Sequence, residues 1–168
     1  EEEEDSIELI KQTAYLMPSE KKVPYLRQLI QQMEMSQALI FASSVYQVDA
    51  VVNMLKKNGI DARAIHSKKR QGALTEALSQ FKSGKLRVLV ATDLMARGID
   101  IHFLPFVINY ELPRSPKDYI HRIGRTGRAE QSGEAITLLT HLELQHFEVI
   151  QKKMGKRVEL IDIDRPVN

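Results

Sequence analysis

Cysteine is absent from the sequence, and no apolar run approaches the length of a membrane span. Without thiols, a disulfide framework and a thiolate metal site are both excluded. A transmembrane helix needs about 18 or more consecutive apolar residues, and the first residues show no signal-peptide pattern either. We therefore expect a soluble protein of the cytoplasm. The chain starts at Glu1 without a methionine, and we expect a fragment of a longer protein.

The residues that are present suit one globular domain. Of 168 residues, 43% are hydrophobic and 27% are charged, which is typical of a single domain with a sizeable core. The formal net charge is only +2, but residues 1–5 are all acidic, whereas basic residues gather at 68–70 and between 114 and 128. We predict that residues 1–6 are an acidic linker or disordered head and that residues 7–168 form one domain. Its basic body suits a polyanionic partner.

Short apolar runs alternate with stripes of apolar residues at helical spacing. The predicted strands lie near 12–16 and at 38–42, 60–65, 88–91, 107–109 and 135–139. The predicted helices occupy 18–33, 45–55, 71–83, 116–122 and 142–154. The tail 158–163 could pair at a sheet edge. This alternation is typical of βαβ units, so we predict an α/β fold with a parallel sheet and helices on both faces, in three αβα layers.

Arginine recurs at every third position in the stretch HRIGRTGR at 121–128. On a helical turn, Arg122, Arg125 and Arg128 would fall close to one face, with His121 one turn before Arg125. The planar guanidinium fork suits the oxygens of a polyphosphate. The two glycines between the arginines each cost a helix about 1 kcal/mol, so we infer that something approaches this backbone closely. A solvated basic turn is the alternative interpretation.

Two more polar stretches follow predicted strands, at the edge where parallel sheets bind ligands. Ser43 and Ser44 offer hydroxyl and N–H groups at a helix start that could hold a phosphate, although taken alone they are better explained as an ordinary N-cap. The stretch 92–100 follows strand 88–91 and places a hydroxyl, two carboxylates, an arginine and a glycine close together. It is too polar for a plain connection.

In this order and spacing, the three stretches resemble motifs IV, V and VI of the DEAD-box RNA helicases. The segments that carry the resemblance are LIFASS at 39–44, VLVATD at 88–93 with RGID at 97–100, and YIHRIGRTGR at 119–128. From about Ile10 to Met154, the chain is similar to the second, carboxy-terminal RecA-like domain of that family. The resemblance therefore implies a RecA-like sheet. The amino-acid sequence of residues 112–119 resembles that of bacterial members, so we expect a bacterial-type protein.

The resemblance implies catalytic roles for four residues. Arg125 and Arg128 match two arginine fingers that reach the γ-phosphate of ATP bound on the other domain, where they stabilise spreading negative charge. His121 and Arg122 match residues that couple the nucleotide to the acidic motif of the first domain.

The resemblance also implies binding roles. Asp100 matches the carboxylate that meets the ATP ribose, and Gly98, Arg125 and Arg128 complete the cofactor-binding set. Thr92 and Asp93 match residues near the RNA backbone, and Arg97 with Gly98 matches the turn that shapes this contact. In the first stretch Ser43, next to Ser44, is expected to contact phosphate through its backbone. The expected RNA-binding residues are therefore Ser43, Ser44, Thr92, Asp93 and Arg97.

The implied whole protein is an ATP-dependent RNA helicase that separates short RNA duplexes locally. RNA would be held by its backbone, with little sequence preference. The chain has neither a GxxxxGK[ST] loop nor an Asp-Glu-Ala-Asp sequence. We therefore expect this domain to be inactive as an ATPase alone, to hold no metal and to work with an amino-terminal RecA-like domain of the same protein, which would hold Mg²⁺. The isolated domain is expected to be a monomer with no membrane contact.

The sequence departs from the family pattern around His66. Ser67 follows this histidine where glycine is usual, and Leu74, three residues after Gln71, stands where an arginine is usual. Leu74 instead completes an apolar helical stripe, so one expected RNA-side contact is missing. His66 itself is better interpreted as a structural or weak RNA-side histidine than as a catalyst.

Two other functions remain open. A DNA helicase or translocase of the same superfamily would be stimulated equally by DNA and RNA. A non-catalytic RNA-binding or partner-docking module would use the arginines only as an electrostatic patch. In that second case, charge removal at Arg125 would weaken RNA binding without changing the ATP turnover of the whole protein.

Overall fold

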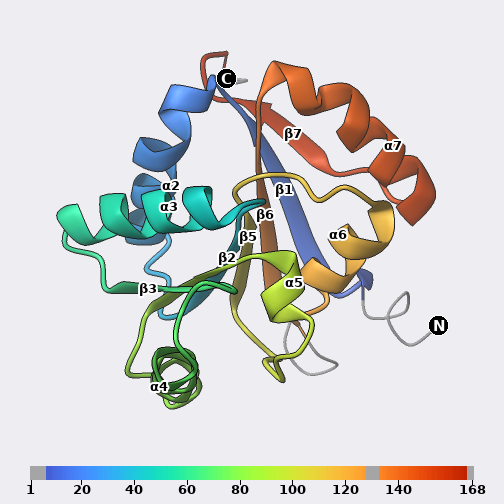
Figure 1. The fold of residues 1–168 in the computed structure, drawn as a ribbon. Coiled ribbons are helices and arrows are strands. Elements are labelled where there is room, and N and C mark those ends of the chain that lie inside the picture. Colours follow the sequence, from blue (N-terminus) through green and yellow to red (C-terminus); the bar gives the residue numbers. More distant parts are fainter. Residues whose placement is uncertain (1–6, 128–132, 166–168) are drawn as a thin grey trace.

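The computed structural model describes residues 7–127 and 133–165. These residues form a seven-stranded sheet with helices on both sides (Figure 1). Its strands are β1 (Ile10–Leu16), β2 (Ala38–Phe41), β3 (Ala62–Ile65), β4 (Val88–Ala91), β5 (Phe106–Asn109), β6 (Gly133–Leu139) and β7 (Glu159–Asp162). They lie in the order β3-β4-β2-β5-β6-β1-β7, and every neighbouring pair is parallel. The predicted parallel sheet is confirmed.

The helices divide between the two faces of the sheet. They are α2 (Lys22–Gln32), α3 (Val45–Lys57), α4 (Gln71–Lys82), α5 (Asp93–Ala96), α6 (Pro116–Ile123) and α7 (Leu144–Met154), with 3-10 turns η1 (Ser19–Lys21) and η2 (His141–Glu143). Buried side chains of α2 and α3 pack in one core cluster, and those of α4 to α7 pack in two others. The three-layer αβα prediction is confirmed.

Strand β2 shows how the sequence fills both layers. Ala38 and Ile40 belong to the cluster under α2 and α3, whereas Leu39 and Phe41 belong to the cluster under α4. Successive side chains of a strand point to opposite faces, so an unbroken apolar run is what a strand covered on both faces needs.

The tail of the chain agrees with the sequence prediction, and one short helix departs from it. The tail pairs at the sheet edge as expected, since β7 runs parallel to β1 with Thr13 opposite Glu159. The short helix α5 was not predicted, because four residues are too few to show a helical stripe. In the described ranges, no helix is long and apolar enough to cross a membrane.

The register brings the predicted site stretches to one edge. Ile65 pairs with Ala91, Phe41 lies between Ala91 and Asn109, and Asn109 pairs with Thr137. The loops after β3, β4, β2, β5 and β6 therefore leave the sheet along the same carboxyl edge. The three stretches, far apart in sequence, become neighbours there.

Candidate active site at the carboxyl edge of the sheet

Helix α6 carries Arg122 into the protein. The helix begins cleanly because Ser115 is its N-cap, with the Ser115 hydroxyl accepting a hydrogen bond from the Asp118 N–H at 3.1 Å, and Pro116 occupies its first turn. Tyr119 and Ile123 anchor it in the core against α7 and β1. Arg122 lies on the buried side as well, and only 2% of it is exposed.

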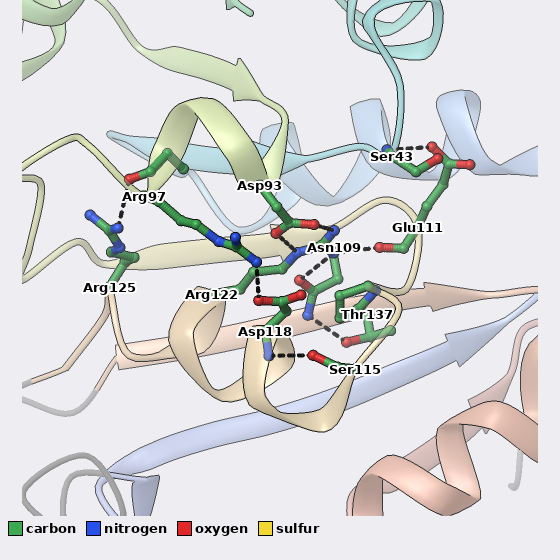
Figure 2. A network of polar contacts seen from close by, with 12 residues as sticks. Ser43, Asp93, Arg97, Asn109, Glu111, Ser115, Asp118, Arg122, Arg125 and Thr137 are labelled. Carbon is green, nitrogen blue, oxygen red and sulfur yellow. Dashed lines mark hydrogen bonds and ion pairs between the residues drawn. The ribbon is translucent and has the colours of Figure 1, made fainter.

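All three nitrogens of the Arg122 guanidinium donate hydrogen bonds within this domain (Figure 2). Nε and Nη2 each donate to one carboxylate oxygen of Asp93 at 2.6 Å, so the pair is bidentate. Nη1 donates to the carbonyl oxygen of Glu111 at 2.6 Å and to Oδ1 of Asn109 at 3.3 Å, and the group lies 5.0 Å from the centre of the Phe41 ring. A buried charge needs such a set of partners to offset its desolvation.

Asn109 and Glu111 are site residues that the sequence reasoning missed. Asn109 is buried at the end of β5, accepts from Arg122 and donates through Nδ2 to the Thr137 hydroxyl at 3.0 Å. The signal was a polar residue closing the apolar run of 106–109, where an unpaired amide would be costly. The Arg122 contacts therefore connect α5 with β5 and, through Asn109, with β6.

The same polar region continues beneath α6. The Tyr119 hydroxyl donates to Oε1 of Gln12 on β1 at 2.8 Å. Burial raises the pKa of Tyr119 to about 12. The phenol is therefore neutral at any physiological pH and serves as a fixed hydrogen-bond donor.

Arg97 lies at the edge of this network and pairs with α6. Its Nη2 donates to Oδ1 of Asp118 at 2.8 Å, and the Arg97 side chain is mostly exposed. Burial would raise the pKa of Asp118, but the hydrogen bonds from Arg97 and Ser115 outweigh it and hold that pKa below its usual value. The pair ties the turn after α5 to the first turn of α6.

Arg125 is held differently from Arg122. Helix α6 ends at Ile123, close to the predicted end at residue 122, so Arg125 follows it in a turn. The Arg125 guanidinium still reaches α5 and the residues after it, donating to the carbonyl oxygens of Ala96, Ile99 and Ile101. Burial lowers the pKa of Arg125, and the nearby Asp100 carboxylate opposes this.

Two other residues predicted to bind the nucleotide, Gly98 and Asp100, are exposed at the surface. Asp100 is exposed, and its Oδ1 lies 2.9 Å from Nε2 of His102. A side chain at Gly98 would meet open space, so this domain gives no steric reason for glycine there. Arg128 lies outside the described residues.

One small hollow joins five of the predicted site residues. Its volume is about 20 Å³, which is room for about one water molecule. Its lining residues are Phe41, Asp93, Ala96, Arg97, Asp118, His121, Arg122 and Arg125. Thr92 adjoins it as the N-cap of α5. A nucleotide would have to lie against this surface rather than enter the hollow.

The first polar stretch combines a helix cap with an occupied backbone donor. The Ser44 hydroxyl accepts from the Gln47 N–H at 3.1 Å, which confirms the N-cap interpretation. The Ser43 N–H donates to Oε1 of Glu111 at 2.9 Å. A carboxylate of this domain therefore lies on the backbone donor that we assigned to phosphate.

His66 and Leu74 are both buried and contact neighbouring residues of the domain. His66 is buried, its Nε2 lies 2.9 Å from Oδ1 of Asp49, and its Nδ1 accepts from the Lys68 N–H at 3.2 Å. Leu74 packs with Phe81 in the core cluster under α4, as its place in the apolar stripe predicted. In the two described segments, no three His, Cys, Asp or Glu side chains gather into a possible metal site.

With this geometry established, comparison with known families identifies the domain. The protein-family model of the helicase conserved C-terminal domain matches residues 21–130, which include all three polar stretches. The chain belongs to that family. Its parallel sheet with helices on both faces matches the RecA-like domains of DEAD-box helicases, including the C-terminal domain of the DEAD-box protein Dbp5, with a TM-score of 0.86 at 29% identity over 95% of this chain and 93% of that one.

Curated relatives of this helicase C-terminal domain are named as RNA helicases. The chain is 41% identical over 160 residues to a probable ATP-dependent RNA helicase, ddx49, of Dictyostelium discoideum, covering 95% of this chain and 32% of that protein. It is 36% identical over 157 residues to DEAD-box ATP-dependent RNA helicase 36 of Arabidopsis thaliana, covering 92% and 32%. The chain thus spans about a third of the length of these relatives.

A solved bacterial structure is also similar. The DEAD-box protein SrmB of E. coli, solved bound to the regulator of ribonuclease activity A, has a TM-score of 0.83 and 32% identity, with 95% of each chain covered. The expectation of a bacterial-type protein is nevertheless not supported, because the first curated relatives are eukaryotic. The amino-acid sequence of residues 112–119 did not discriminate between bacterial and eukaryotic members.

Proposed function

We propose that this domain supplies half of a split ATP site and half of an RNA cleft in an ATP-dependent RNA helicase. The observation that carries the proposal is Arg125, a half-buried guanidinium at the sheet edge that is held by neutral carbonyl oxygens and flanked by Asp100. Phosphate oxygens can replace carbonyl oxygens as acceptors and add a full negative charge. The names of the relatives, ATP-dependent RNA helicases, support the assignment.

The residues present fit a nucleotide. Arg125 offers a planar fork for phosphate oxygens, and the exposed carboxylate of Asp100 suits the hydroxyl groups of a ribose. Bound ATP supplies the γ-phosphoryl group that is transferred to water. Arg125, with Arg128, stabilises the negative charge that develops during this transfer.

Arg122, by contrast, acts by holding the site together. Its bidentate pair with Asp93 fixes the start of α5, and its contacts with Glu111 and Asn109 fix the loop after β5. We propose that Arg122, together with His121 on the same helix, couples the nucleotide side to the first domain through this framework.

The RNA half of the cleft lies along the same edge. Ser43 and Ser44 precede α3. Asp93 is the first residue of α5, and Thr92 and Arg97 are its caps. We propose that an RNA phosphate replaces Glu111 at the Ser43 N–H, because both are anions suited to the start of a helix. Contacts of this kind read the backbone, so little sequence preference follows.

The remaining parts of the reaction are assigned to the rest of the protein. We propose that a preceding RecA-like domain binds most of the ATP and holds Mg²⁺, and that closure of the two domains brings Arg125 onto the γ-phosphate. The domain alone is then a monomer inactive as an ATPase. We propose the cytoplasm as its location.

The test is RNA-stimulated ATP turnover of the whole protein and of this domain alone. Arg125→Ala should lower turnover of the whole protein about 10³-fold, in line with other arginine fingers. Arg114→Ala removes the same charge from an exposed loop and should leave turnover within about twofold, which makes it the matched control.

Each alternative has its own outcome in the same experiment. Normal turnover in Arg125→Ala would contradict the finger assignment and favour a binding module. Equal stimulation by DNA and RNA would favour a DNA translocase. Turnover by the isolated domain would contradict the split site.

A further inference from the structure

Strand β3 lies at one edge of the sheet, away from the site described above. Among the described residues it pairs with β4 on one side, with Ala62 opposite Val88, and with no strand on the other side. The outer edge of β3 therefore presents backbone N–H and C=O groups that no described strand uses. Such an edge can pair with a strand of another chain unless it is covered by a helix or loop.

Helices α3 and α4 flank the β3 edge without closing it. Ala62 packs in the core cluster under α3 and Ile65 in the cluster under α4, so the two helices lie on opposite faces of the strand (Figure 1). Residues of α3, β3 and α4 line a hollow of about 430 Å³, a size common among ligand sites. The wall residues Val52, Ala73 and Ala77 have short side chains, which leaves room beside the strand.

The lining of this hollow carries more positive than negative charge. Its cations are Lys56, Arg63 and Lys69, and its one carboxylate is that of Asp49, which lies 3.9 Å from the Lys69 ammonium. Arg63 lies 3.8 Å from Glu76, but both side chains are largely exposed, so water weakens this pair and another carboxylate can compete for the guanidinium. Lys56 makes no ion pair within the described part of the chain. The hollow therefore favours an anionic occupant.

The charge and the strand edge together select the kind of partner. A second copy that paired its own β3 with this edge would bring the same cations against one another, which is unfavourable. RNA would supply phosphate oxygens to the cations, but it has no row of alternating donors and acceptors to match the edge of a strand. An extended peptide with acidic side chains supplies both.

We propose that the β3 edge binds an extended acidic segment of a partner protein as an additional strand of the sheet. Main-chain hydrogen bonds to β3 supply affinity, and the carboxylates of the segment pair with Lys56, Arg63 and Lys69. The cations give selectivity, because they repel basic segments and further copies of this chain. None of the residues assigned to ATP or RNA takes part, so the inference does not depend on the proposed function.

The experiment measures how a labelled peptide of alternating glutamate and valine binds to the whole protein, by fluorescence anisotropy. Lys56→Glu should raise the Kd about tenfold or more, because a carboxylate then faces the acidic peptide. Lys57→Glu reverses the next charge of α3 outside the hollow and should change the Kd by less than about twofold. Both residues lie in the last turn of α3, so the two variants should share one melting temperature. Ala73→Phe fills the hollow from an exposed position without changing its charge and should also weaken binding.

Two further measurements test the strand pairing itself. Amide hydrogen exchange at residues 62–65 should slow about tenfold or more when the peptide saturates the protein, because the outer N–H groups of β3 become hydrogen-bonded. A peptide with the same side chains but a methyl group on every backbone nitrogen keeps its carboxylates and lacks the donors, so it should not bind. A peptide of alternating lysine and valine should not bind either.

Three results would overturn the inference. The first is no binding of the acidic peptide at about 1 mM. The second is equal binding of the methylated peptide, or binding without slower exchange at residues 62–65. The third is single-stranded RNA that loses affinity in Lys56→Glu while the affinity for the peptide stays unchanged, which would assign the hollow to RNA.

Discussion

Arg122 and Arg125 are three residues apart and are held in opposite ways. Arg122 is buried and bound by both oxygens of Asp93, whereas Arg125 lies half-buried against three carbonyl oxygens. If a buried cation separates from its carboxylate partner, two uncompensated charges result. A cation held by neutral carbonyl dipoles can instead exchange these dipoles for an anion. We therefore propose a structural task for Arg122 and a ligand-binding task for Arg125.

Loss of Arg122 should have the largest effect on stability. Arg122→Leu leaves Asp93 without its counter-charge in a partly buried place, so we expect the free energy of unfolding to fall by about 3–5 kcal/mol. Urea unfolding of the isolated domain measures this. Arg114→Leu on the exposed loop is the control, with an expected change within about 0.5 kcal/mol. A loss below about 1 kcal/mol in Arg122→Leu would remove the contrast between the two arginines.

Gly133→Ala should displace the backbone that carries Arg125. A Cβ at Gly133 would lie 1.9 Å from Oγ1 of Thr126 and 2.5 Å from the Gly127 nitrogen, so the turn after α6 has to move. We expect a loss of about 2–3 kcal/mol in urea unfolding. At Gly72 an added Cβ meets open space, so Gly72→Ala should be neutral or slightly stabilising. Equal stability of the two variants would show that the backbone of this turn shifts without lowering the free energy of unfolding.

A second buried cation, Lys22, tests whether the rule for Arg122 is general. Lys22 donates to Glu143 at 3.1 Å and to the carbonyl oxygen of Tyr110 at 2.7 Å. Burial would raise the pKa of Glu143, but the Lys22 ammonium and the backbone N–H groups of Thr140 and Leu112 outweigh it, so this pKa lies below its usual value. The stabilisation is therefore present at neutral pH and is lost as the pH falls through the folded-state pKa.

Glu143→Gln should accordingly cost about 1–2 kcal/mol at pH 7 and progressively less as the pH falls below about 4. The measurement is urea unfolding of both proteins between pH 3 and pH 7. A difference that stays constant over this range would mean that the carboxylate charge contributes nothing.

Arg125→Ala should change stability least. Its guanidinium makes hydrogen bonds only to carbonyl oxygens among the contacts described, so we expect a loss below about 1 kcal/mol in urea unfolding, against the 10³-fold loss of turnover in the whole protein. A loss as large as that of Arg122→Leu would assign a structural role to both arginines.

Much of the site was predictable because its signals are local. The hydroxyl of Ser44 before an apolar stripe predicted the N-cap, and the polar residues after predicted strands predicted that these stretches meet at one sheet edge. Asn109 and Glu111 were missed, because their importance comes from partners on α6 and at the start of α3 rather than from their neighbours in sequence.

The sequence by itself determined the parallel α/β fold, the sheet edge at which the three polar stretches meet and the presence of an arginine-rich segment there. Periodicity and strand–helix alternation are local properties, and they suffice for these features. Only the tertiary structure decided which arginine is buried against a carboxylate and which is half-buried against carbonyl oxygens. That choice depends on where α6 ends and on which acceptors α5 and the loop after β5 bring to each guanidinium, and long-range packing sets both.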